Sequence, residues 1–396
     1  MFDTLMSRNW LGLAISAAVL LVGVGLILAA ALIPSDIVRL ADQLLGAVAV
    51  VLAVILLGAS LRHLMLVSHY ARKFPPPGRL IDVGGYRMHY VAAGEGTPTV
   101  IWIPGSHSQG LALNHLHKRT AEFTRSLIFD RPSSGWSDIG PFPRTVLSEA
   151  RELETLLRRA GERPPFVVGA HSFGGALATT FAELFPEQVA GLVLIDITTA
   201  DATVYGNSLQ RGPPKVPGLG MKTILGAAFG LHWTALKQGF ENDKASYDSL
   251  ADVAGPLLSN AAQPRSPVAF RSALQALWRE PLGTARGQHV LSDIPIFAII
   301  PPDLPFPTVE SVRALVPHVS EYVARGYIRN YRTAQESVAL LSRRGEIRWA
   351  PPNSTHAVPY EAPDFIMKQM ADMVALVRSE AEKRREKAHV ESAGTS

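Results

Sequence analysis

Two long uncharged stretches open the chain and differ in pattern from everything after them. Trp10 to Ile33 contains no charged residue, and Leu44 to Leu61 is a second uncharged run, which Arg62 closes. Runs of this length can cross a hydrocarbon layer of ~30 Å. They should do so as helices, because backbone amides in lipid must form hydrogen bonds within their own segment. The pattern predicts a two-helix membrane anchor over residues 1–73.

Each run has an alternative interpretation. A cleaved signal peptide has an apolar core of about 7–15 residues, shorter than the first run, and no second span behind it. The second run could be a buried helix of a soluble domain. The loop between the runs carries only Arg39 among its basic residues, whereas Arg8 precedes the first run and four basic residues follow the second, namely Arg62, Arg72, Lys73 and Arg79. The positive-inside rule then predicts a two-pass protein of the cell membrane, with both ends and the following domain in the cytoplasm.

After residue 74, short apolar runs alternate with segments of helical spacing. Leu80 to Val83 and Tyr86 to Val91 flank Gly84-Gly85, which is a hairpin signal. Helical spacing covers Thr145 to Ala160, and further helices are expected over 176–184 and 364–377. The remaining expected strands are Thr99–Ile103, Leu127–Asp130, Phe166–Val168, Leu192–Asp196, Ile296–Ile300 and Glu346–Ala350. An opening antiparallel hairpin followed by such alternation predicts an α/β fold with a mostly parallel sheet covered by helices on both faces.

Three segments break this rhythm. Residues 197–293 hold helical pieces, prolines and glycines but no clear strand, so we expect a helical cap inserted into a domain spanning 74–378. Within it, the almost uncharged Leu219 to Trp233 is either a helix packed on the core, an apolar wall of a pocket or a face dipping into lipid. Phe74 to Gly78 reads FPPPG, a stiff linker expected to hold the domain off the bilayer. Residues 379–396 are charged and poor in bulky apolar side chains, which predicts a disordered tail.

Composition and charge narrow the functional classes. Apolar residues make up 47% of the chain, and the net charge is only +4. The basic residues form no stripe or patch in sequence, so nucleic acid is not an expected partner. The chain contains no cysteine, which excludes disulfides, thiolate metal sites and a cysteine nucleophile.

Val167 to Gly175, VVGAHSFGG, carries the strongest chemical signal. An apolar strand runs directly into a turn around Ser172, and a helix follows, as a nucleophile elbow requires. The turn is tight, so the residues two before and two after the serine must be small. Gly174 fits, and Ala170 adds only a methyl group to the more usual glycine. Ser172 is therefore the candidate nucleophile.

A serine nucleophile needs a base, and in enzymes with such an elbow the histidine comes last in chain order. His356 lies in a polar loop between the last expected strand and the closing helix. His115 and His117 could suggest a metal pair, but no third ligand is evident, so we expect a surface pair and no metal site. An oxyanion hole would take one backbone N–H from Phe173 and a second from Ser106, in the loop after Thr99–Ile103.

The region from Pro76 to about Val377 resembles the α/β-hydrolase superfamily, especially its bacterial members. The matching pieces are PPGRLIDVGGYRMHYVAAGEGTPTVIW, FDRPSSGWSD, PRT, GAHSFGG, VAGLVLID and HAVPYEAP. The resemblance implies the α/β-hydrolase fold and a Ser-His-Asp triad. The superfamily's usual acid follows the later strand, which favours Asp303, whereas some members place it after the earlier strand, at Asp196. Close relatives tend to keep the earlier aspartate, so Asp196 is preferred narrowly over Asp303.

The predicted activity is hydrolysis of an ester, lipophilic in view of the anchor and the apolar cap, through an acyl-enzyme. Thioesterase, amidase and peptidase activities of the same fold are alternatives, as is a non-catalytic membrane-anchored binding module. Epoxide hydrolases and dehalogenases need an aspartate nucleophile at the position that Ser172 occupies. These two activities are therefore not expected. No nucleotide or metal motif is present, so no cofactor is expected, and the sequence leaves the oligomeric state open.

Overall fold

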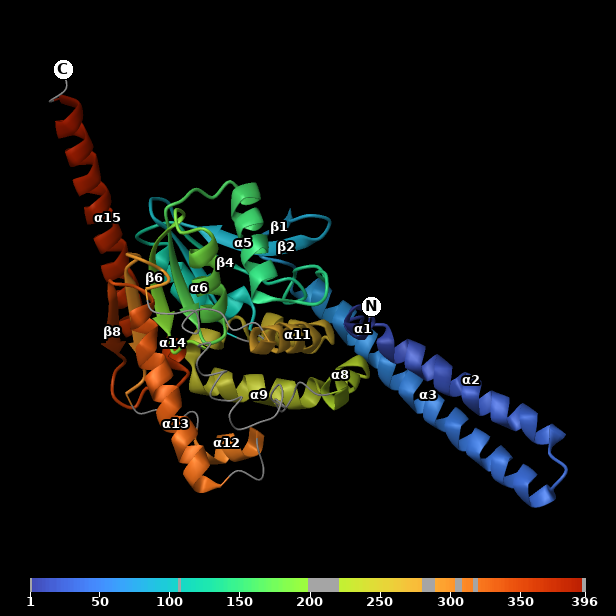
Figure 1. The fold of residues 1–396 in the computed structure, drawn as a ribbon. Coiled ribbons are helices and arrows are strands. Elements are labelled where there is room, and N and C mark those ends of the chain that lie inside the picture. The colour runs from blue at the N-terminus through green and yellow to red at the C-terminus, as the bar shows by residue number, and fades with distance from the viewer. Residues whose placement is uncertain are drawn as a thin grey trace.

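The computed structural model describes residues 2–105, 108–198, 221–279, 289–302, 308–315 and 320–393. A central sheet lies between two layers of helices, and a pair of long helices projects from one side of this domain (Figure 1). The expected fold class, α/β with a mostly parallel sheet, an opening antiparallel hairpin and two N-terminal apolar helices, is confirmed.

The sheet has eight strands in the order β1-β2-β4-β3-β5-β6-β7-β8. The pairs β1/β2 and β2/β4 are antiparallel, and all other neighbours are parallel. The strands are β1 (Arg79–Asp82), β2 (Arg87–Ala93), β3 (Thr99–Ile103), β4 (Ser126–Phe129), β5 (Phe166–His171), β6 (Val189–Ile195), β7 (Ile296–Ile300) and β8 (Gly345–Trp349). Every residue of β3, β4, β5 and β7 is buried, which explains why these strands read as continuous apolar runs.

Helices cover both faces of the sheet. One core cluster joins the sheet to α5 (Val146–Ala160) and α6 (Gly174–Leu184). The other joins it to α4 (Asn114–Thr120) and the first half of α15 (Pro363–Ala393). The ends of α5 follow from its sequence: Thr145 and Ser148 form a reciprocal capping box, and Gly161 ends the helix at φ +82°.

The described part of 197–293 is helical and contains no strand, as expected of a cap. Further helices follow β7 and β8. The cap helices are α8 (Met221–Ala228), α9 (Trp233–Ser246), η3 (Asp248–Leu250), α10 (Ala254–Ala261) and α11 (Arg265–Arg279). The later helices are α12 (Val309–Leu315), α13 (Glu321–Glu336), η5 (Ser337–Leu341) and α14 (Val358–Glu361).

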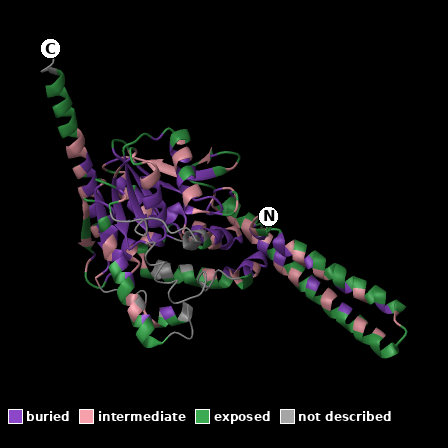
Figure 2. Ribbon diagram, viewed as in Figure 1, coloured by how far each residue is buried: buried purple, intermediate pink, exposed green. Residues whose placement is uncertain are grey.

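The N-terminal region is an antiparallel helical hairpin with its tip far from the sheet (Figure 1). After the short α1 (Phe2–Met6), α2 (Leu11–Ala29) and η1 (Ala30–Leu32) form the first arm, and α3 (Asp36–Lys73) forms the second. Both arms are long and apolar enough to cross a membrane. Their surface is largely exposed, unlike the buried sheet (Figure 2). The second helix is longer than the expected span, because α3 continues past Arg62 without a break.

Cap residues pack against Leu66, Val67 and Tyr70 of α3, just before the linker, so the hairpin and the cap are in direct contact. That the linker holds the domain off the bilayer stays a prediction. The expectation about the tail differs from the structure. The segment 379–396, expected to be disordered, is helical as far as Ala393, where the described residues end. Its alanines and long charged side chains favour a helix, and the pairs Glu380–Arg384 and Lys387–Glu391 support one exposed face.

Candidate active site

Ser172 stands at the turn between β5 and α6, at the carboxyl end of the parallel strands. Its backbone has φ +53°, a left-handed conformation that non-glycine residues rarely adopt. Small neighbours make this turn possible. A Cβ on Gly174 would lie 2.6 Å from the carbonyl oxygens of Ile103 and Pro104, and one on Gly105 would lie 3.0 Å from Ser172 Cβ. The backbone therefore closes tightly around this turn, and Ser172 itself is buried.

His356 lies in the loop between β8 and α14 and faces this turn. Its Nε2 is 3.0 Å from Ser172 Oγ, and its Nδ1 is 2.6 Å from Asp196 Oδ2. One imidazole thus bridges a hydroxyl and a carboxylate. With Nδ1 donating its proton to the carboxylate, Nε2 is left as an acceptor for the serine proton.

Asp196 follows the last residue of β6 and is almost fully buried. Its backbone also has a left-handed conformation, with φ +39°. Among the described residues, Oδ2 contacts His356, while Oδ1 is buried and has no hydrogen-bond partner. Asp303, the alternative acid, lies outside the described residues.

His171 supports the loop that carries His356. Its Nε2–H donates to the carbonyl oxygen of His356 at 2.8 Å, and the two rings lie at 39° to each other with their centroids 4.7 Å apart. Burial, followed by the nearby His356, lowers the pKa of His171 to about 3, so this ring is neutral at physiological pH. This role could not be predicted from the sequence, because the residue before an elbow serine is variable.

Phe173, the expected oxyanion donor, is the N-cap residue directly before α6 and is buried. The second expected donor, Ser106, lies outside the described residues. The preceding residue, Gly105, is held by Arg131, whose Nη2 donates to its carbonyl oxygen at 2.7 Å. The same guanidinium lies over the Phe173 ring, 5.6 Å from its centroid. Arg131 therefore links the two segments from which the oxyanion donors are expected.

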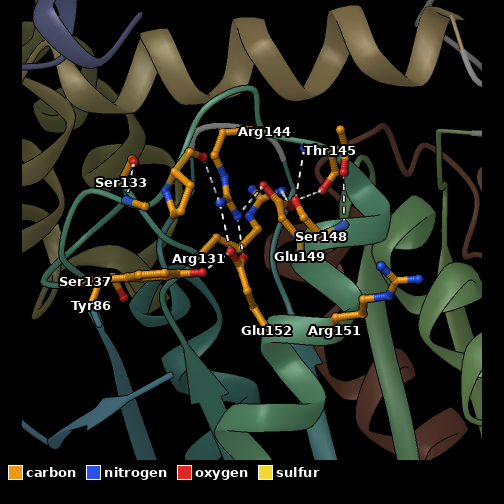
Figure 3. Close-up of polar contacts among 12 residues, drawn as sticks. Tyr86, Arg131, Ser133, Ser137, Arg144, Thr145, Ser148, Glu149, Arg151 and Glu152 are labelled. Atoms are coloured by element: carbon orange, nitrogen blue, oxygen red, sulfur yellow. Dashed lines mark hydrogen bonds and ion pairs between the residues drawn. The ribbon is translucent and has the colours of Figure 1, made fainter. Parts of the chain in front are cut away.

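A buried ionic network continues from Arg131 (Figure 3). Arg131 lies 3.9 Å from Glu149, and Arg144 lies 3.6 Å from the same carboxylate. Arg144 also forms a two-pronged contact with Glu152, and Tyr86 donates its hydroxyl to that group. Burial raises the pKa of Glu149, and the two arginines oppose this effect. Sequence reasoning missed the network, although the motifs FDRPSSGWSD and PRT contain both arginines.

A cavity of about 790 Å³ lies beneath the cap and reaches Ala357, the residue after His356. Ala357, directly after His356, and Ser108, in the loop after β3, line one side. The cap supplies mostly apolar side chains, from Ala227, Ala235, Leu236, Leu250 and Leu257. Residues 219–233 are expected to form either a helix packed on the core or an apolar wall of a pocket, and the described part, from Met221, does both. In α8, Ile224 is buried, and Thr223 and Ala227 line the cavity.

His115 and His117 are expected to form a pair on the surface, and the structure differs. His117 is buried and contacts Ser126 Oγ through Nδ1 at 2.9 Å, and His115 Nε2 lies 2.8 Å from the carbonyl oxygen of Pro359. Both rings thus join secondary-structure elements. In the described parts of the chain, no group of three or more acidic or histidine side chains is arranged to hold a metal ion.

The model of a known family, described as the alpha/beta hydrolase family, matches residues 100–369. The chain belongs to this family. The match includes Ser172, Asp196 and His356, and membership supports activity as a hydrolase.

Individual relatives are distant or cover little of the chain. The uncharacterized protein YbdG of Bacillus subtilis (strain 168) is 23% identical over 151 residues, which cover 38% of this chain and 46% of that protein. The lipase LipV of Mycobacterium tuberculosis (strain ATCC 25618 / H37Rv) is 47% identical over 58 residues, or 15% of this chain and 22% of LipV. The chain thus spans less than half the length of both relatives.

A solved structure, that of a probable hydrolytic enzyme from Pseudomonas aeruginosa PAO1, has a TM-score of 0.57 with this chain. The identity is 17%, and the superposition covers 76% of this chain and 95% of that one. At this identity, the similarity shows a shared fold.

Proposed function

We propose that the protein is a serine hydrolase that cleaves a lipophilic ester through an acyl-enzyme, with Ser172, His356 and Asp196 as its triad. The observation that carries the proposal is the bridging position of His356, 3.0 Å from Ser172 Oγ and 2.6 Å from Asp196 Oδ2. The apolar cavity that ends at Ala357 supports a lipophilic substrate.

In the first half-reaction, Ser172 Oγ attacks the ester carbonyl and its proton passes to His356 Nε2. Asp196 holds the imidazole in this tautomer and stabilises the imidazolium that forms. The backbone N–H groups of Phe173 and Ser106 stabilise the tetrahedral oxyanion. The C–O bond to the leaving alcohol then breaks, and His356 gives its proton to that alcohol.

In the second half-reaction, water attacks the acyl-Ser172 carbonyl and gives its proton to His356. Collapse of the second tetrahedral intermediate breaks the bond to Ser172 Oγ, which takes the proton back. The products are the carboxylic acid and the free enzyme. Besides the ester, water is the only other reactant in these two half-reactions.

We further propose that α2 and α3 insert into the cell membrane as a hairpin, with the hydrolase domain on the cytoplasmic side. Their apolar length supports insertion. The chain has no cysteine, so a thiol introduced by Glu391→Cys can be tested with a membrane-impermeant maleimide. Labelling only after the membrane is opened would support the orientation, and labelling of intact cells would contradict it.

Covalent labelling tests the nucleophile. A fluorophosphonate should modify the wild type and fail to modify Ser172→Ala. Ser134→Ala is a matched control, since Ser134 is buried to a similar degree, 8% against 9% exposed. Equal labelling of wild type and Ser172→Ala would refute the proposal. Matched ester, thioester and amide substrates with one acyl chain would then identify the bond that is cleaved.

A further inference from the structure

The cap is joined to the helical hairpin at a neck where α2, α3 and α8 meet. Gly12 of α2 allows this close approach, because a Cβ there would lie 2.5 Å from the Ala228 carbonyl oxygen and 2.6 Å from Ser60 Oγ. Nearby, the Trp233 indole donates to His63 Nδ1 at 3.2 Å. The cap and the hairpin therefore form one continuous packed unit.

The neck coincides with the end of both apolar stretches. The uncharged run of α2 begins at Trp10, and that of α3 ends before Arg62. Gly12, which approaches both Ala228 and Ser60, and Ser60 itself stand within two residues of these limits. With the hairpin inserted as proposed, the α8–α9 turn, residues 229–232, lies at the membrane boundary.

Exposed apolar side chains gather around this boundary. Leu231, at the α8–α9 turn, is 68% exposed, and Trp10 is 48% exposed. Phe2 and Leu5 of α1 are exposed too, although Met6 of the same helix packs with residues of α8. Water would penalise such a cluster, whereas the interfacial zone of a bilayer favours it, aromatic rings in particular.

The cavity extends from Ala357, next to His356 in the chain, to this same turn. Ala227, two residues before the turn, and His232, the last residue of the turn, line it, while Ala357 at the other side follows His356 in the chain. Its volume of about 790 Å³ falls within the ~300–1,000 Å³ typical of small-molecule pockets. A path from the bilayer surface to Ser172 would therefore run along α8 and α9.

We propose that the substrate is a membrane lipid ester that reaches the cavity from the bilayer across the α8–α9 turn, with Leu231 immersed in the interface. This inference rests on the proposed function. It names the source of the substrate, because an acyl chain taken from the bilayer needs no transfer through water. A water-soluble ester arriving from the aqueous side is the alternative that the test must separate.

The first test compares two substrates of the full-length protein in phospholipid vesicles. One is a long-chain acylglycerol embedded in the vesicle, and the other is soluble p-nitrophenyl acetate. Leu231→Asp should lower the ratio of lipid to soluble-ester turnover about ten-fold, since interfacial contact scales with buried apolar area. Leu340→Asp, which replaces an exposed leucine of η5 (46% exposed), should leave the ratio unchanged.

The outcomes separate the two proposals. An unchanged ratio in Leu231→Asp would overturn the membrane route, as would a wild type that cleaves only the soluble ester, and both would leave the serine hydrolase intact. A wild type inert towards both substrates would overturn the proposed function and the substrate assignment with it.

A second measurement does not depend on catalysis. Because the chain has no cysteine, Leu231→Cys and Leu340→Cys each give a single site for a fluorescent label. Nitroxide-labelled phospholipids in the vesicle should quench the fluorophore at position 231 and not at position 340. Equal quenching, or none at position 231, would overturn the proposal that this turn contacts the bilayer.

Discussion

Ser172 and Asp196 occupy equivalent positions, each one residue beyond the paired ends of two adjacent parallel strands. His171 of β5 is in register with Ile195 of β6, and the Ser172 N–H donates to the Ile195 carbonyl oxygen at 3.1 Å. Both residues then turn through left-handed backbone, at φ +53° and +39°. The two side chains are thereby presented at the same sheet edge, where His356 spans them.

This geometry predicts that Asp196 is the triad acid. Asp196→Asn should lower kcat by about 10³–10⁴-fold with little change in KM, because the imidazole loses its partner and the tautomer that it needs. Asp303→Asn is the matched control and should retain wild-type kcat. Steady-state kinetics of both variants on one ester decide the matter, and the reverse pattern would assign the acid to Asp303.

The sequence predicted the sheet and the elbow well because both depend on local patterns. The strand Thr99–Ile103 has the same bounds in the structure, and VVGAHSFGG forms the strand–turn–helix expected of it. The choice between Asp196 and Asp303 stayed open, since which strand end faces His356 depends on the lengths of loops far apart in the chain. The catalytic roles themselves stay predictions.

Contacts between distant segments were the main features that could not be predicted. Packing of α3 on the cap involves Trp233 and His63, and no local pattern in either segment indicates the partner. Burial of His117 likewise depends on Ser126 of the neighbouring strand. A charged tail such as 379–396 reads as disordered by composition, yet its helix simply prolongs the docked first half of α15.

The lowered pKa of His171 predicts that the folded protein loses stability in acid. Its pKa is lowered from 6.5 to about 3 in the folded protein, so between these values the unfolded chain binds a proton that the folded chain does not. Stability should therefore fall as pH falls below about 6.5, by at most ~1.4 kcal/mol per pH unit for this group. His171→Gln, which keeps an N–H donor for the His356 carbonyl, should flatten the curve. Thermal unfolding in detergent between pH 4 and 7 measures it, and parallel curves for the two proteins would contradict the prediction.

The tight packing of the elbow predicts that even one methyl group is harmful at Gly174. The added Cβ would lie 2.6 Å from two backbone oxygens, so Gly174→Ala should lower kcat at least ten-fold and stability by ~1–3 kcal/mol. Gly239→Ala, in α9, is the control because nothing lies within 4 Å of its Cβ position. That change should stabilise the helix by up to ~1 kcal/mol. If both substitutions were tolerated equally, the prediction that the elbow has no room for a Cβ on Gly174 would be wrong.

The contacts of Arg131 predict that its replacement affects stability and catalysis through two different interactions. Arg131→Met removes the hydrogen bond to the Gly105 carbonyl. It also takes one of two arginines away from Glu149, and the other, Arg144, lies 3.6 Å from that carboxylate. Loss of one partner from a buried ionic group costs ~3–5 kcal/mol, so the apparent melting temperature should fall. The double variant Arg131→Met/Glu149→Gln removes both charges and should recover much of that stability.

The kcat of this double variant is the decisive measurement. If Arg131 positions the backbone that supplies the oxyanion donors, kcat should stay about ten-fold or more below wild type while KM changes little, because a weakened oxyanion contact affects the transition state more than the bound substrate. A kcat that recovers together with the melting temperature would instead assign Arg131 a purely structural role. The two quantities respond differently because the carboxylates of the ionic network belong to α5, whereas Gly105 packs closely against Ser172 itself.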